Sequence, residues 1–549
     1  MDNEKHRRIV SSALWSAYGD ALGFMTELAD QSRVIHRTGQ SSVTSTKSWR
    51  RKIGSKIGVF VEFPAGTYSD DTQLRLATSR AIRADGTFDV AAFAKVELPA
   101  WANYALGAGL SSKEAANNLA RTSATWYSNF YETKRSSYVH AGGNGGAMRI
   151  QPHVWAAKSY IDFDSIFLDV FKNTICTHGH PRAFVGACFH ALSLGLALDA
   201  GRPMPLNELI LQTDELRNLP RLVEADHDLT FFWLGAWQEK TKSSFQSAVD
   251  LTVDEIVEDL ELLQSIETKN VENNYERAVA ILDAASDQNR GSATKTAILA
   301  SYLSYLYRDA KTDKAMEIAA NMLGSDTDSI ATMAGAILGA CNEAQMSYPI
   351  QDKAYLLEEA ERMVAVSNGD GKRSFSYPDL RKWKPQRIAV DAISLTNDGL
   401  ILNGVARAAR IDSPPLKESQ DIQMAWLRLS FGQTILARIR NNPAIVTDIE
   451  ERVVTDRQLP RESNRDSVAT KNYDLFAASK VKDSLNPNTK ISSKTLNEIL
   501  NDVINSNFDP RIIGESILNQ ADKRNNDFVE RSIALTANII TAYRARLKK

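Results

Sequence analysis

The chain has 549 residues, 43% of them apolar, and 65 Lys and Arg against 67 Asp and Glu, a formal net charge of -2. Roughly two to four domains fit this length, and the apolar content is sufficient for a buried core. The near-zero charge gives no overall attraction to nucleic acid or to an anionic membrane, so neither partner is indicated. No run of about 20 apolar residues occurs, so we expect no membrane span.

The three cysteines, Cys176, Cys188 and Cys341, have no metal-ligand spacing among them. Few and scattered cysteines are typical of reduced thiols. The first residues, MDNEKHRRIV, are charged, and Asp20 and Glu27 soon interrupt the residues that follow. A secretory signal needs an apolar run at this place, so we expect a cytoplasmic protein.

Apolar residues recur at helical rather than strand spacing through most of the chain, which predicts an all-α fold. The first such stripe consists of Val10, Leu14, Ala17 and Ala21. Gly19 and Gly23, four positions apart on the same predicted helix, would let a second backbone approach closely. The segment GDALGFMTE (19–27) then ends in the acidic Glu27.

A polar stretch over 31–58 follows and contains a strongly basic segment. Its cations are Lys47, Arg50, Arg51, Lys52 and Lys56, placed around Trp49. We interpret this segment as a solvated loop. The alternative is a surface that meets an anionic substrate or partner.

The motif GTYSDDTQL (66–74) places Asp70 and Asp71 between hydroxyl residues, after a glycine turn and before a predicted helix. Ser, Thr and Asp at such a position cap free N–H groups and favour the helix dipole. The motif GSDTDSIAT (324–332) repeats the arrangement with Asp326 and Asp328. Capping needs only one acceptor, so it does not explain why paired carboxylates occur twice.

If the two acidic motifs meet in the fold, their carboxylates would repel one another unless a cation neutralised them. A set of Asp, Glu, Ser and Thr oxygens suits Mg²⁺, Mn²⁺ or Ca²⁺ rather than zinc. Four or five carboxylates exceed what one Mg²⁺ usually takes from a protein. The number therefore favours a site for two metal ions.

Two further motifs lie between the acidic ones. In HAGGNGGAMRI (140–150), four glycines around Asn144 can expose N–H groups to a phosphate or simply form a turn. In CTHGHPRA (176–183), His178 and His180 are either buried and hydrogen-bonded or in contact with substrate. The apolar stretch 182–198 that follows predicts a central helix.

The motifs GDALG with Glu27, YSDDTQ, GNGGAMR, THGHPRA and GSDTDSIATMAGAILGA together resemble the ADP-ribosylglycohydrolase family over about residues 5–366. The resemblance implies an all-α bundle with two Mg²⁺ ions, or Mn²⁺, at the base of an ADP-ribose cleft. The metal ligands it implies are Ser69, Asp70, Asp71, Asp326, Asp328 and Ser329. Serine stands at two of these positions where the family commonly has threonine, and it supplies the same hydroxyl oxygen.

The resemblance also implies roles for residues around the metals. Glu27 matches the acidic residue of a loop that closes over the site, and Glu27, Asp70 and Asp71 are the candidates for moving the proton. The implied substrate-binding residues are Gly142, Gly143, Asn144, Gly145, Gly146, Met148 and His178. Ala141 and Gly142 precede the glycine loop where some relatives have a larger residue.

The function implied is hydrolysis of the bond between ADP-ribose and a modified protein side chain, in a regulatory, toxin-immunity or defence setting. Two alternatives stay open. One is a hydrolase of a small ADP-ribose conjugate or nucleotide. The other is a protein that binds ADP-ribose or a partner without turnover.

The predicted domains are a catalytic domain over 1–366, an extension and linker over 367–415, and a C-terminal helical region over 416–549. Within the extension, 388–406 could pair as strands around an NDG turn, and 411–420 is typical of a linker. Amphipathic helices are expected at 491–504 and 526–546. Their expected role is packing onto the catalytic domain, and the alternative is oligomerisation or binding of a protein partner.

Overall fold

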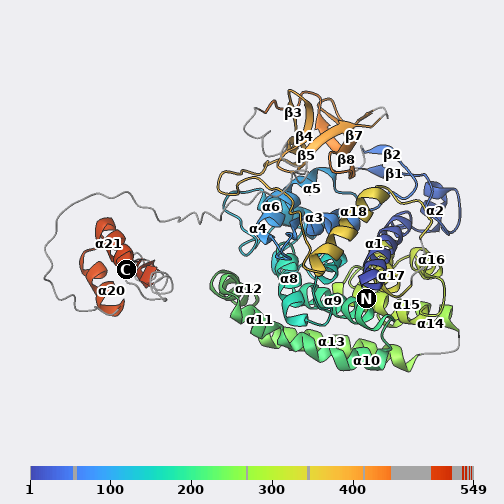
Figure 1. The fold of residues 1–549 in the computed structure, drawn as a ribbon, viewed down its shortest axis with the longest axis horizontal. Helices are drawn as coiled ribbons and strands as arrows, with labels where there is room; N and C mark the ends of the chain where they lie inside the picture. The colour runs from blue at the N-terminus through green and yellow to red at the C-terminus, as the bar shows by residue number, and fades with distance from the viewer. Residues whose placement is uncertain are drawn as a thin grey trace, which may run out of the picture. The chain divides into compact units, whose positions relative to one another are not determined.

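The computed structural model describes residues 2–53, 58–266, 270–342, 346–411, 415–446, 496–521, 535–536, 538–540, 543 and 546. The chain forms two compact units, Met1–Arg461 and Glu462–Lys549. Figure 1 shows the ribbon. The first unit is mainly helical, as the spacing of apolar residues predicts.

The helices of the first unit alternate with short loops. Up to residue 200 they are α1 Asp2–Phe24, α2 Gln31–Thr38, α3 Asp70–Ala81, α4 Val90–Ala92, α5 Leu98–Tyr104, α6 Leu110–Leu119, α7 Gln151–Trp155, α8 Phe163–Ile175 and α9 Pro181–Ala200. Beyond it they are α10 Leu206–Gln212, α11 Leu219–Ala225, α12 Gly235–Thr241, α13 Phe245–Ser265, α14 Val271–Ile281, α15 Ala293–Leu306, α16 Thr312–Asn321, α17 Thr327–Cys341 and α18 Lys353–Ser367. Short 3₁₀ or π turns are η1 Phe93–Glu97, η2 Tyr138–His140, η3 Ala147–Arg149, η4 Thr213–Asn218, η5 Leu229–Leu234 and η6 Ala389–Ala392.

Helices α1 and α17 lie side by side and antiparallel (Figure 1). A Cβ atom at Gly19 would lie 2.3 Å from the carbonyl oxygen of Ala331, and one at Gly23 would lie 2.4 Å from that of Thr327. No side chain fits in these gaps, so the close approach predicted for the two glycines is confirmed. The partner is the helix that begins with the second acidic motif.

Helix α9 is the central helix predicted over 182–198. Most of its residues are fully buried, among them Phe184, Val185 and Phe189. It is long and apolar enough to cross a membrane, but 83% of its most apolar window is buried inside the protein. Cys176, Cys188 and Cys341 are free thiols.

Part of the basic segment forms strand β1 Trp49–Ile53, which pairs antiparallel with β2 Val59–Phe63, whereas Lys56 lies outside the described residues. The prediction of a solvated loop is wrong for β1. The ring of Trp49 is buried, stacks on Phe63 at 4.8 Å and meets Phe24 edge-on at 5.1 Å. Alternation along β1 leaves Arg50 exposed and turns Arg51 partly inward. Because most residues of β1 are basic, the alternation of its side chains was not apparent from the sequence.

A second sheet follows the helices. Its strands are β3 Ile393–Thr396, β4 Gly399–Leu402, β5 Ala406–Arg410, β6 Leu416–Lys417, β7 Ile422–Leu429 and β8 Thr434–Arg440. They pair antiparallel in the order β3-β4-β5-β7-β6, with β8 on β7. The strand pairing predicted within 388–406 is confirmed. The linker predicted over 411–420, of which 412–414 lie outside the described residues, and the helices predicted from 416 are wrong as far as residue 440, where β6, β7 and β8 lie instead.

Buried polar side chains join this sheet to the helices. Arg80 of α3 makes two 2.8 Å hydrogen bonds to the carboxylate of Glu97, and its Nη1 donates to Gln433 at 2.9 Å. The side-chain amide of Asn103 on α5 donates to the carbonyl of Arg438 on β8 at 2.9 Å. These contacts cross the boundary predicted after residue 366.

The second unit contains α20 Leu496–Asn505 and α21 Pro510–Ala521. Its small apolar core consists of Ile499, Val503, Phe508, Leu535 and Ile539. The helix predicted over 491–504 is present from residue 496. Most of the helix predicted over 526–546 lies outside the described residues.

Candidate active site

The first acidic motif lies at the N-terminus of α3. Ser69 is the N-cap residue, and its Oγ accepts the N–H of Asp71 at 3.2 Å. The carboxylate of Asp20 on α1 accepts the N–H of Ser69 at 2.8 Å and that of Thr72 at 2.9 Å. Asp20 therefore fixes the start of α3. The sequence prediction missed this role, although Asp20 stands in the GDALG motif amid apolar residues.

The second acidic motif lies at the N-terminus of α17, with Asp326 at the N-cap position. Ser329 donates from Oγ to Asp71 Oδ1 at 3.4 Å, across 258 positions of sequence. Asp71, Asp328 and Ser329 are all buried. The two acidic motifs therefore meet, which their sequence separation left open.

The glycine loop 142–146 lies against the second motif. The side-chain amide of Asn144 donates to Asp326 Oδ2 at 3.0 Å and to Thr296 Oγ1 at 3.1 Å. The N–H of Asn144 donates to the carbonyl of Gly291 at 2.8 Å. The N–H of Asn144 therefore already has a partner within the protein. Asn144 orients Asp326.

Met148 and His178 lie next to the glycine loop: the N–H of Met148 donates to the carbonyl of Asn144 at 2.9 Å, and a Cβ atom at Gly145 would lie 2.9 Å from the His178 ring. Met148 is buried, with its sulfur 4.0 Å from Ser329 Oγ. His178 Nδ1 lies 2.7 Å from Thr177 Oγ1. Burial, and then the charge of Arg149, lowers the pKa of His178 to about 3, so its imidazole is neutral.

Gly145 and Gly146 serve this packing, because a Cβ atom at Gly145 would lie 2.9 Å from the His178 ring and one at Gly146 would lie 2.5 Å from Thr174. Gly142, Gly143 and Gly145 keep part of their surface exposed, whereas Gly146 is buried. The loop therefore offers main chain to a ligand at three of the predicted positions.

Glu27 and Asp70 border a common space at Gly107. A Cβ atom at Gly107 would lie 3.0 Å from Asp70 Oδ1 and 3.5 Å from Glu27 Oε2. Gly107 has a φ of 81°, which glycine adopts without strain. The guanidinium of Arg51 donates to Glu27 Oε2 at 2.7 Å. Glu27 is thus close to the first acidic motif and bonded to a cation.

The acidic side chains of this cluster carry more negative charge than the neighbouring cations balance. Burial, followed by repulsion from neighbouring carboxylates, raises the pKa of Asp70, Asp71 and Asp328 well above the ordinary value. Burial also raises the pKa of Glu27, and Arg51 opposes that shift. Asp71 Oδ2 is buried and has no hydrogen-bond partner in the described part of the chain. A cation would satisfy both the charge and this oxygen.

Within the described residues, no group of three or more His, Cys, Asp or Glu side chains is arranged to hold a metal ion. The cluster therefore fits a hard cation through its oxygen donors and its excess negative charge, and not through a coordination shell already formed.

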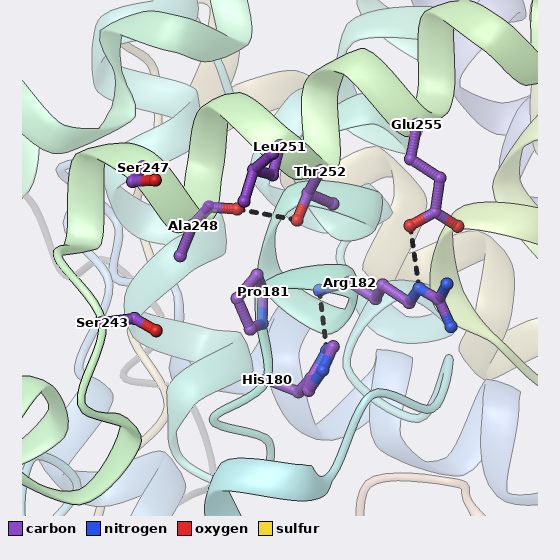
Figure 2. A pocket seen from close by; sticks show the side chains of 9 residues that line it. All are labelled: His180, Pro181, Arg182, Ser243, Ser247, Ala248, Leu251, Thr252 and Glu255. Carbon is purple, nitrogen blue, oxygen red and sulfur yellow. Dashed lines mark hydrogen bonds and ion pairs between the residues drawn. The ribbon is translucent and has the colours of Figure 1, made fainter.

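A cavity of about 460 Å³ has none of the predicted metal ligands in its lining (Figure 2). It is lined by His180, Pro181, Arg182, Ser243, Ser247, Ala248, Leu251, Thr252 and Glu255. Figure 2 shows Arg182 bonded to Glu255, at 2.9 Å, and to His180 through its N–H, at 3.1 Å. A Cβ atom at Gly142 would lie 3.1 Å from His180 Nδ1, so the cavity adjoins the glycine loop.

A family model described as ADP-ribosylglycohydrolase matches residues 1–362. The chain belongs to the ADP-ribosylglycohydrolase family. This membership confirms the resemblance drawn from the five motifs, and the helical fold agrees with it.

The ADP-ribosyl-(dinitrogen reductase) glycohydrolase of Rhodospirillum rubrum is 27% identical over 204 residues, which are 36% of this chain and 62% of that protein. The chain thus spans less than two thirds of the length of this relative. A solved structure named "ADP-ribosylglycohydrolase-related protein complex" is 18% identical, with a TM-score of 0.39. It covers 67% of this chain and 99% of its own.

The ADP-ribosylglycohydrolase-family region ends near the C-terminus of α18. The sheet β3–β8 lies beyond the match, yet Asn103 and Arg80 bond to it from within the match. All predicted metal ligands lie inside the matched region. Ser69 is the one whose hydroxyl already accepts a hydrogen bond from within its own motif.

Proposed function

We propose that this chain hydrolyses the glycosidic bond that joins ADP-ribose to a modified protein side chain. The observation that carries the proposal is the meeting of Ser329 with Asp71, which brings two acidic motifs together in a chain of the ADP-ribosylglycohydrolase family. The name of the curated relative gives an ADP-ribosyl-modified protein as its substrate. That name supports a protein substrate here.

The proposed cofactor is a pair of divalent cations, Mg²⁺ or Mn²⁺. The residues that would hold them are Ser69, Asp70, Asp71, Asp326, Asp328 and Ser329. The Oδ2 atom of Asp71, which has no partner in the described part of the chain, supports this assignment, because a buried carboxylate oxygen needs a partner. If bound there, such ions would attract sugar hydroxyls and would lower the pKa of a bound water molecule.

The carboxylates of the chain would manage the proton. Hydrolysis at the anomeric carbon passes through an oxocarbenium-like state, which requires a group to protonate the leaving atom or to take a proton from water. Of Glu27, Asp70 and Asp71, only Glu27 stands outside the proposed ligand set. Glu27 is therefore our choice for the proton carrier.

The partly exposed main chain of Gly142, Gly143 and Gly145 would receive the pyrophosphate. Asn144 would act indirectly, by holding Asp326. His178 is neutral and bonded to Thr177, so its role would be to support the loop.

The test is release of ADP-ribose from arginine-modified and serine-modified proteins, with Mg²⁺ and with a chelator. We expect metal-dependent release from the wild type and a loss of about 10²-fold or more in Asp70→Ala/Asp71→Ala, as for removal of other preorganised charged groups. Asp287→Ala, at a side chain that is 98% exposed, is the matched control. Release that survives chelation, or the double substitution, would refute the metal-dependent mechanism. Tight ADP-ribose binding without any release would favour the binding-protein alternative.

A further inference from the structure

Three arginines hold the turn that carries Glu27. Arg37 donates to the carbonyl of Glu27 at 2.8 Å, and Arg33 donates to the carbonyl of Leu28 at 3.2 Å. Arg51 donates to the carboxylate of Glu27 at 2.7 Å. Two arginines from α2 thus bind the main chain of the turn, whereas the arginine from β1 binds the side chain.

The main chain of this turn is strained. Leu28 has a φ of 53°, a value that costs a residue with a Cβ atom about 1–2 kcal/mol. The side chain of Leu28 is about half exposed, so its own packing does little to offset that cost. The strain persists because neighbouring contacts impose it, and strain of this kind is frequent where a functional group must be aimed.

Arg51 is itself well fixed. Its guanidinium lies 5.2 Å from the centre of the Phe24 ring. Its strand is anchored through Trp49, which packs on both Phe24 and Phe63. The side chains of Arg51 and Glu27 are 20% and 11% exposed, so the ion pair is largely shielded from water. A shielded pair holds its geometry better than a pair at the surface.

The carboxylate of Glu27 needs such a partner. Asp70 Oδ1 and Glu27 Oε2 lie 3.0 Å and 3.5 Å from the same point beside Gly107, so two carboxylates of like charge border one small space. Lys113 is within electrostatic range of Glu27 and Asp70. In the part of the chain that the structure describes, however, Arg51 is the cation bonded to the Glu27 carboxylate.

We propose that Arg51 is the positioning residue of Glu27, which holds that carboxylate beside Asp70 in the orientation needed for proton transfer. This inference rests on the proposed function. It assigns the basic hairpin β1–β2 a role inside the site. From the sequence alone, this segment was interpreted as a solvated loop or as a surface for an anionic substrate or partner.

The experiment compares kcat and KM for ADP-ribose release among the wild type, Arg51→Gln, Arg51→Lys, Glu27→Gln and the double variant Glu27→Gln/Arg51→Gln. We expect Arg51→Gln to lower kcat by about 10²-fold with little change in KM, the effect of a misplaced catalytic group. Arg51→Lys keeps a cation and should recover part of the loss. The double variant should be no slower than Glu27→Gln, because Arg51 acts through Glu27.

Arg50→Gln is the matched control. Arg50 is the neighbour on the same strand, is exposed, and loses the same charge in the substitution. It should keep the wild-type kcat. A wild-type kcat in Arg51→Gln would overturn the proposal. The proposal would also be overturned if Arg51→Gln lowered kcat by the same factor in the Glu27→Gln background as it does in the wild type.

Thermal unfolding of the same four variants separates this inference from the proposed function. If Arg51 and Glu27 bond as described, their substitutions are non-additive in Tm, and the double variant is more stable than the sum of the single losses. Additive losses in Tm would overturn the contact even in an active enzyme. Coupling in Tm with no release by the wild type would refute the proposed function and support the contact.

Discussion

Gly23 of α1 lies directly against the main chain of Asp328 on α17, where a Cβ atom would come within 2.5 Å of the Asp328 Cα. This contact joins the helix that leads into Glu27 to the helix that begins with the second acidic motif. The distance between the two helices therefore sets the distance between parts of the candidate site.

Gly23→Ala should move the acidic start of α17, because the neighbouring atoms are main chain and cannot swing aside. We expect a loss of about 1–3 kcal/mol or more in the free energy of unfolding, measured in urea, together with reduced ADP-ribose release. The control is Gly235→Ala at the start of α12, where an added Cβ meets nothing within 4 Å. It should be neutral or stabilising by about 0.5–1 kcal/mol. Equal effects of the two substitutions would contradict the tight contact.

Asp20 supplies both oxygens to the first turn of α3. Asp20→Ala leaves the buried N–H groups of Ser69 and Thr72 without an acceptor, at about 1–3 kcal/mol for each. Asp20→Asn keeps one acceptor and should lose less stability. Amide hydrogen exchange at residues 69 and 72 should be slowest in the wild type, faster in Asp20→Asn and fastest in Asp20→Ala. Identical protection in the wild type and Asp20→Ala would show that other groups take over.

The buried ion pair of Arg80 and Glu97 should be costly to break from one side only. Glu97→Gln leaves the guanidinium of Arg80 without its counter-charge and should destabilise the protein by about 3–5 kcal/mol. Arg80→Met/Glu97→Met should lose less than Glu97→Gln alone. Removing the exposed pair of Arg202 and Glu208 should cost no more than about 1 kcal/mol. If Arg80→Met/Glu97→Met had a lower free energy of unfolding than Glu97→Gln, this explanation would be wrong.

His190 makes the folded protein sensitive to acid. Burial lowers its pKa to about 3, whereas the same histidine in the unfolded chain titrates near 6.5. Below about pH 6.5 the unfolded state therefore binds a proton that the folded state does not. Stability then falls by about 1.4 kcal/mol per pH unit for this group, down to about pH 3.

His190→Gln removes that group and should make the loss of stability between pH 6.5 and 4.5 about 2.3 kcal/mol smaller. Urea unfolding at several pH values measures the slope. An unchanged slope would mean that the imidazole is protonated inside the fold. His227→Gln, at an exposed side chain, is the matched control for the substitution itself.

The sequence predicted the helices, the family and the acidic motifs, because each depends on local spacing or on residue types in a fixed order. It could also foresee that Gly19 and Gly23 permit a close helix contact. It could not identify the partner helix, because that depends on a tertiary contact across about 300 residues.

Asp20 and Arg51 were missed for a related reason. A lone aspartate in a helix and a basic residue in a polar stretch each have many ordinary roles, and only the fold shows which atoms they meet. The strands β7 and β8 were missed because only part of each strand alternates between buried and exposed side chains, and the first residues of β8 are buried without a break.

The pairing of α1 with α17 has a consequence for how the protein is made. Thr327 bonds to the carbonyl of Gly23 across 304 positions. At about 5–20 residues per second, the ribosome needs about 15–60 s to make the intervening chain. During this time the face of α1 that carries Gly19 and Gly23 has no α17 packed against it. Synthesis from the N-terminus therefore delays completion of the site until most of the first unit has emerged, and chaperones that shield apolar helices would have their substrate in this interval.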